Sequence, residues 1–99
     1  EGVEFLSADR QGEDVWCTML APGIQQLIAW DYRDPEGGEH SFDSMGSSVY
    51  ASEPGQENLE EELHQISFAL RDYPWDTVEL KLNFTHETAF DPPIAVELQ

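Results

Sequence analysis

The sequence predicts one α+β domain over residues 1–99, in which an antiparallel sheet of about five strands carries one main helix on one face. Three observations support this prediction. Residues 75–84 alternate between apolar and polar side chains, residues 59–73 carry apolar side chains at helical spacing, and residues 34–38 form a turn-rich connector. The predicted order of elements is β-β-β-α-β-β.

The first half of the chain predicts two strands before the connector. Val15–Leu20 is rich in strand-forming residues and ends at a Pro-Gly turn, and Ile24–Arg33 follows it. In the second of these strands Ile28, Trp30 and Tyr32 are expected to share one face, because side chains alternate along a strand. Residues 1–14 do not decide between a strand and the end of a helix.

A hairpin and a return strand are predicted next. In Asp34-Pro35-Glu36-Gly37-Gly38, proline presets the turn entry and the two glycines accept positive φ. The return strand is predicted over His40–Met45. It is followed by a polar loop, residues 46–55, that contains Tyr50.

A helix and two strands are predicted for the second half. The helix rests on an apolar stripe with spacings of four, three, four and three: Leu59, Leu63, Ile66, Leu70 and Tyr73. Asn58 and Glu61 have the form of a capping box, and Pro74 ends the helix. Strands are predicted over Trp75–Phe84 and Ile94–Leu98, with Phe90–Pro93 as an interruption between them.

Charge is the dominant feature of the composition. Asp and Glu number 21 against 4 Lys and Arg, which gives a formal net charge of -17. Nucleic acid and anionic membranes are disfavoured partners, because phosphate contacts require clusters of Lys and Arg. A basic protein is the natural complement. The single cysteine, Cys17, is expected to be a buried small hydrophobe, and with no signal peptide pattern the expected location is the cytoplasm.

The sequence contains no convincing catalytic or metal-binding motif, so we expect no enzyme, no cofactor and no metal. No glycine-rich phosphate-binding motif is present. His40, His64 and His86 are widely separated, and His64 is expected to be a solvated helix residue. The acidic residues between Asp31 and Asp43 do not have the spacing of a calcium-binding EF-hand loop.

The predicted function is binding to a basic protein through exposed carboxylates with aromatic anchors nearby. The acidic candidates surround the hairpin, whose tip is expected to be exposed. The partner-binding candidates are Asp31, Asp34, Glu36, Glu39, Asp43, Trp30, Tyr32 and Tyr50. Trp30 also has the spacing of a core residue.

By its order of elements, the chain resembles the YezG-like family of bacterial immunity proteins over roughly residues 15–91. The resemblance rests on a helix with Leu63, Leu70 and Arg71, a short Pro/Trp turn, and a Trp-x-Thr strand that begins at Trp75. It implies an acidic antitoxin that neutralises a bacterial toxin, often a nuclease, by covering the substrate site of the toxin. Such a protein would be a monomer or half of a 1:1 complex.

Two alternatives remain open at this stage. A nucleic-acid mimic would also be acidic, but its carboxylates would be spaced like phosphates along an extended face. Adaptation to high salt would produce an acidic, Lys-poor surface with no particular partner, and a chain of this kind would unfold in dilute buffer.

Overall fold

The computed structural model describes residues 2–43, 49–51 and 62–98, and these residues form eight β-strands and no helix. The strands are β1 (Glu4–Gln11), β2 (Asp14–Pro22), β3 (Leu27–Arg33), β4 (Glu39–Asp43), β5 (Val49–Ala51), β6 (Leu63–Leu70), β7 (Thr77–Phe84) and β8 (Thr88–Glu97). The predicted α+β class is therefore wrong, and the described part of the chain is all-β. Its residues include no helix that could cross a membrane.

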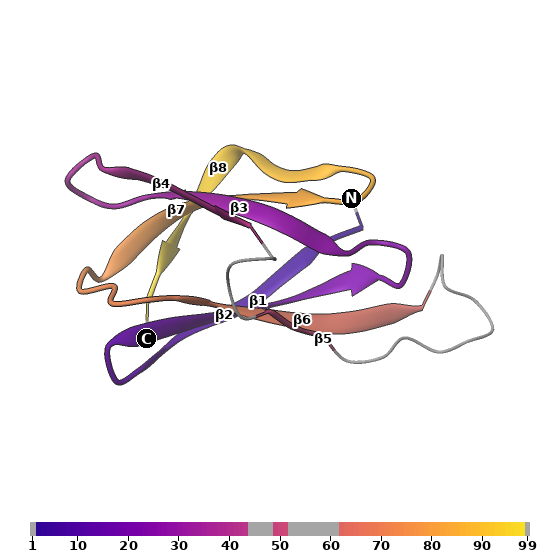
Figure 1. Ribbon diagram of the computed structural model, residues 1–99, viewed down its shortest axis with the longest axis horizontal. Helices are drawn as coiled ribbons and strands as arrows, with labels where there is room; N and C mark the ends of the chain where they lie inside the picture. Colours follow the sequence, from indigo (N-terminus) through magenta and orange to yellow (C-terminus); the bar gives the residue numbers. More distant parts are fainter. Residues whose placement is uncertain (1, 44–48, 52–61, 99) are drawn as a thin grey trace.

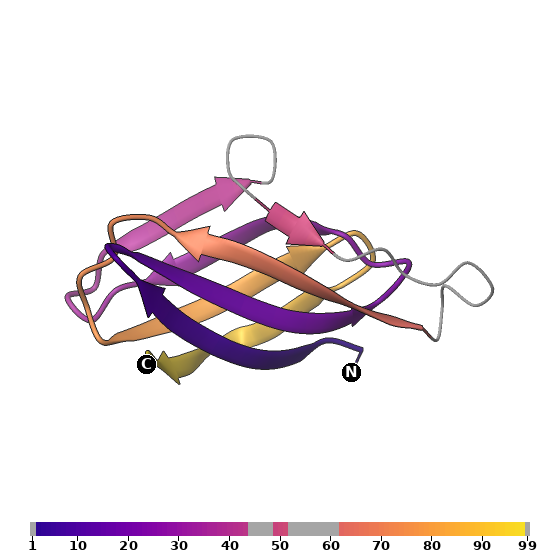
Figure 2. The same ribbon diagram turned by 90° about the horizontal axis from the view of Figure 1, so that it is seen from below.

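Two four-stranded antiparallel sheets stack as two layers (Figure 1). The first sheet has the order β1-β2-β6-β5 and the second has the order β4-β3-β7-β8. Figure 2 shows the first sheet in front of the second. Apart from the added edge strand β4, this strand order is that of the immunoglobulin constant-type sandwich.

The core lies between the sheets, because each central strand has one apolar face that the other sheet covers. The inward residues of these strands are Val15, Cys17, Met19, Trp30, Tyr32, Ile66, Phe68, Leu70, Val78, Leu80 and Leu82. Trp30 of the second sheet meets Phe68 of the first, with ring centroids 4.6 Å apart. Cys17 is buried as expected, and burial, with a smaller contribution from Asp9, raises the pKa of its thiol to about 12.

The segment predicted as the helix contains strand β6. Its buried residues include Ile66, Phe68 and Leu70, which recur every two positions, whereas Leu63 is 50% exposed. Ile66 and Leu70 are four residues apart, a separation that puts two side chains on one face in a helix and in a strand alike. Only the four-residue spacings of the stripe fit both structures. The three-residue spacing from Leu63 to Ile66 fits a helix alone, and in the strand it puts Leu63 on the opposite face from Ile66. Leu59, Asn58 and Glu61 lie outside the described residues.

Strand β3 begins later than predicted and contains an irregularity. Its register to β7 shifts between Leu27 and Ala29, so Leu27 is buried and Ile28 is 47% exposed. The expectation that Ile28 shares a face with Trp30 and Tyr32 is therefore wrong, because a bulge reverses the side-chain alternation behind it. The hairpin over residues 34–38 is confirmed, with Gly37 at a φ of 90°.

The remaining strands differ mainly in extent. Val15–Leu20 and residues 77–84 are confirmed as strands, β4 covers the described part of the predicted return strand, and residues 4–11 form β1. Phe90–Pro93 does not end the last strand, since β8 runs from Thr88 to Glu97, but the predicted interruption appears as a gap in the pairing of β8 with β7. Proline is tolerated there because β8 lies at the edge of its sheet, and its pairing with β7 skips from Ala89 to Ile94.

Candidate protein-binding face

The outer face of the second sheet collects charged side chains from all four of its strands. In each strand the residues that alternate with the buried ones point away from the core, and the strand register brings them side by side. Six carboxylates and two cations lie there: Asp31, Glu39, Asp43, Glu79, Asp91 and Glu97, with Arg33 and Lys81. We call these eight residues the acidic face.

Both cations of the acidic face contact carboxylates from neighbouring strands. Arg33 lies between two of them, with Nη2 4.0 Å from Glu39 Oε2 and Nη1 3.7 Å from Glu79 Oε1. Lys81 Nζ is 3.9 Å from Asp31 Oδ2, and Ser41 donates a hydrogen bond of 2.6 Å to Asp31 Oδ1. Exposed pairs of this kind contribute only about 0–1 kcal/mol each. They can therefore be exchanged for contacts with a partner at little cost.

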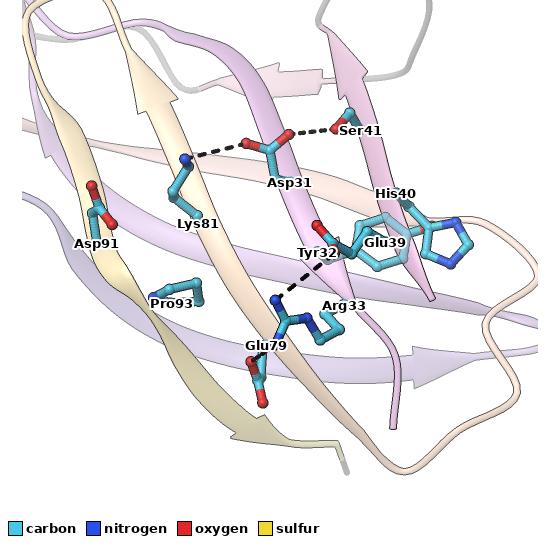
Figure 3. Close-up of a pocket in the computed structure, with 10 residues that line it drawn as sticks. All are labelled: Asp31, Tyr32, Arg33, Glu39, His40, Ser41, Glu79, Lys81, Asp91 and Pro93. Atoms are coloured by element: carbon cyan, nitrogen blue, oxygen red, sulfur yellow. Dashed lines mark hydrogen bonds and ion pairs between the residues drawn. The ribbon is translucent and has the colours of Figure 1, made fainter. Parts of the chain in front are cut away.

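A groove of about 390 Å³ opens on this face (Figure 3). Its floor is formed by side chains of β3 and β7, and β4 and β8 line its two sides. Figure 3 shows Arg33 between Glu79 and Glu39, and Lys81 directed toward Asp31. The face is thus hollowed and carries more negative than positive groups around the hollow.

The predicted partner-binding residues are divided between several environments. Asp31, Glu39 and Asp43 belong to the acidic face, and Glu36 is exposed in the hairpin, where its Oε2 accepts a hydrogen bond of 3.1 Å from Trp75 Nε1.

The aromatic candidates are not beside them on that face. Trp30 and Tyr32 belong to the core, with 1% and 7% of their surface exposed, and strand alternation turns their side chains inward. Tyr50 is 62% exposed but lies on β5, in the other sheet. The expected combination of carboxylates with adjacent aromatic anchors is therefore not found among these residues.

Asp34 is 6% exposed, so the expectation that it is presented to solvent is wrong. Its Oδ1 accepts hydrogen bonds of 2.9 Å from the backbone N–H groups of Glu36 and Gly38, and its Oδ2 lies 3.1 Å from His40 Nε2. An aspartate that accepts backbone hydrogen bonds in this way stabilises a tight turn. The hydrogen bond with His40, followed by those from the backbone, lowers the pKa of the Asp34 carboxyl against the opposing effect of burial.

We predict that Asp34→Asn destabilises the chain near neutral pH and that the difference from wild type shrinks in acid. A lowered folded pKa means that the ionised carboxylate stabilises the fold above its unfolded pKa of about 3.9. This stabilisation is lost as the pH falls through that value toward the folded pKa. Thermal unfolding midpoints between about pH 7 and about pH 2.5 test the prediction. Asp9→Asn, which removes an exposed charge from β1, is the control. A difference in midpoint between Asp34→Asn and wild type that does not change with pH would contradict the prediction.

The sequence predicts three of the eight residues of the acidic face, Asp31, Glu39 and Asp43, and misses the other five. Glu79 and Lys81 were placed correctly on the polar side of the strand that follows the predicted helix, but nothing linked that strand to β3. Asp91 falls in the predicted interruption and Glu97 in the last predicted strand, and neither has a predicted role. The signal was the alternation itself, which identifies outward residues once the strand partners are known.

The histidines occupy three different environments. His64, predicted as a solvated helix residue, is 6% exposed on β6, and its Nε2 lies 3.1 Å from the Gln25 backbone oxygen. The prediction for His64 was wrong because the segment is strand β6 and not a helix, and the even-numbered residues of β6 face the core. His40 contacts Asp34, and His86 is exposed. In the described ranges, no three His, Cys, Asp or Glu side chains are grouped so that they could hold a metal ion.

Comparison with protein-family models, curated proteins and solved structures gives no match to this chain. The fold that the immunity-protein resemblance implied is not present, because Leu63 and Leu70 lie on a strand and Arg71 lies in the turn after it. The acidic face therefore has to be interpreted from its own geometry.

Proposed function

We propose that this domain is a protein-binding module that presents the acidic face to a positively charged partner protein. The observation that carries the proposal is a groove that holds two cations and is lined by one carboxylate from each of four adjacent strands: Asp31, Glu39, Glu79 and Asp91. Asp43 and Glu97 lie farther along the same face. Strand pairing holds the backbone positions of these side chains in place before binding, which reduces the entropy that association costs.

The charge of the face identifies the class of partner. Arg33 and Lys81 each contact carboxylates of the same face, so a partner that brings Lys or Arg side chains meets a surplus of negative charge. Complementary charge accelerates encounter by about 10- to 1,000-fold, and the acceleration falls as ionic strength rises. Inhibition of a basic nuclease toxin by a 1:1 complex in the cytoplasm is one specific form of this proposal.

Two variants that each lose three negative charges distinguish the effect of the acidic face on binding from the effect of net charge. The first neutralises the face with Glu39→Gln, Glu79→Gln and Glu97→Gln. The second neutralises three exposed glutamates elsewhere, Glu4→Gln, Glu13→Gln and Glu62→Gln. Each immobilised chain is exposed to a lysate of the source cells, and basic proteins retained by the wild-type chain are then purified and their association rates measured.

The proposal predicts that the face variant slows association with the retained basic protein by about tenfold, while the control variant changes it by less than about threefold. The wild-type rate should also fall by about tenfold between roughly 0.05 M and 0.5 M salt. Equal effects of the two triple variants would mean that net charge and not this face drives binding, and a rate indifferent to salt would remove the electrostatic basis.

A further inference from the structure

The first sheet presents an outer face of different chemistry. Side chains from three neighbouring strands meet there: Trp16 and Thr18 of β2, Gln65 and Ser67 of β6, and Tyr50 of β5. We call these five residues the aromatic shelf. Its members carry rings, hydroxyls and an amide, and none of them is an Asp, Glu, Lys or Arg residue.

The two rings of the shelf contact each other, and one of them, Tyr50, lies beside a hollow. Trp16 and Tyr50 have ring centroids 5.6 Å apart and an interplanar angle of 39°. Tyr50 is the most exposed of the large hydrophobic residues that the structure describes, at 62%. A hollow of about 380 Å³ lies next to it, lined by Tyr50, Ala51, Gln65 and Ser67. The small residues Ala51 and Ser67 leave the space that the Tyr50 ring borders.

Hydrogen-bonding groups occupy the centre of the shelf. Thr18 Oγ1 and Ser67 Oγ are 3.1 Å apart, so one hydroxyl donates to the other. In such a pair the accepting hydroxyl keeps its own proton for another acceptor, and both oxygens keep lone pairs. A ligand seated over the rings would therefore meet both a donor and acceptors.

This combination selects among ligand classes. A dry apolar partner surface would remove water from the hydroxyls and the amide. It would offer no hydrogen bonds in place of those made to water, and this loss costs free energy. Nucleic acid bases stack on aromatic rings, but their phosphates are repelled by a chain of net charge -17. A neutral sugar has an apolar C–H face for the rings and hydroxyls around its rim, and it carries no charge.

We infer that the aromatic shelf binds a neutral carbohydrate. One pyranose ring stacks on Tyr50, with its hydroxyls directed to Ser67, Thr18 and Gln65. Asp9, which faces Trp16 across the β1–β2 register, lies at the margin of the shelf as a further acceptor. The site is on the opposite sheet from the acidic face, so the two can be tested separately.

Affinity gel electrophoresis of the full chain in native gels tests the inference. The probes are four soluble neutral polysaccharides, each cast into the gel: laminarin, dextran, galactomannan and arabinoxylan. At least one is expected to retard the wild-type chain. Tyr50→Ala should weaken that association by about tenfold, as expected when a stacking contact of about 1.4 kcal/mol is lost. Tyr50→Phe keeps the ring and should stay within about threefold of wild type.

The face variant with Glu39→Gln, Glu79→Gln and Glu97→Gln should be retarded as strongly as the wild-type chain. Because the variant has lost three charges, the retardation of each chain is measured relative to its own mobility in a gel without polysaccharide. Thermal unfolding of Tyr50→Ala shows whether the fold is kept, and Gln65→Ala gives a second probe of the shelf on another strand. The inference is overturned if none of the four polysaccharides retards the wild-type chain, or if Tyr50→Ala and Gln65→Ala are retarded as strongly as wild type. If no polysaccharide binds and Tyr50→Ala fails to retain a protein that the immobilised wild-type chain retains from the lysate, the shelf is a protein interface instead.

Discussion

Replacing Trp30 by alanine is expected to lower the free energy of unfolding by about 3–5 kcal/mol. Trp30 is 1% exposed and contacts Phe68 of the opposite sheet at a centroid distance of 4.6 Å. The substitution removes the largest side chain that joins the two layers and leaves a cavity that rigid strands cannot fill. Natural domains have about 5–15 kcal/mol of stability in total, so the loss is a large fraction. Urea denaturation followed by circular dichroism measures it.

Trp30→Phe is the matched control, because it keeps a ring against Phe68. The indole N–H of Trp30 is buried and has no hydrogen-bond partner among the described residues. An unpaired buried donor costs about 1–3 kcal/mol, so its removal offsets part of the volume that is lost. We therefore expect Trp30→Phe to cost less than half as much as Trp30→Ala. A Trp30→Ala cost below about 1.5 kcal/mol would show that the sheets are held together elsewhere.

The strands that could be predicted from the sequence are those with an unambiguous period of two. In β7, Val78, Leu80 and Leu82 alternate with polar residues, and no helical stripe competes with that pattern. In β6, Ile66 and Leu70 satisfy both periods, and Phe68, which would have indicated a strand, was left out of the stripe. The segment therefore carries a helical pattern and a strand pattern at once, and the sheet that covers it determines which face is buried.

The acidic face was predicted only where it is local in sequence. Asp31, Glu39 and Asp43 belong to one hairpin, whose turn signals identify it without other information. Glu79 and Glu97 join them through the pairing of β7 with β3 and β8, which depends on long-range register. The burial of Asp34 also could not be predicted from the sequence pattern. Aspartate occurs both in exposed loops and in turns where its carboxylate accepts hydrogen bonds from the backbone.

Arg10 shows how this chain uses one of its few basic residues. Its Nη1 donates to the Tyr73 backbone oxygen at 2.5 Å, and its Nη2 donates to the Trp75 oxygen at 2.6 Å. The guanidinium therefore ties β1 to the connection between β6 and β7, where the chain crosses from one sheet to the other. This geometry requires the two-pronged donor of arginine, which a lysine ammonium cannot reproduce.

Arg10→Ala is expected to cost about 2–4 kcal/mol, because two charge-assisted hydrogen bonds are lost and two carbonyls lose their donors. Arg10→Lys keeps the charge and should recover less than half of that loss. Arg71→Ala removes the same charge from a side chain that is 61% exposed and pairs with Asp14, so it should cost about 0–1 kcal/mol. Urea denaturation of the three variants distinguishes the two causes. Equal losses for Arg10→Ala and Arg71→Ala would mean that the more negative net charge destabilises this acidic chain, and not the loss of the two Arg10 hydrogen bonds.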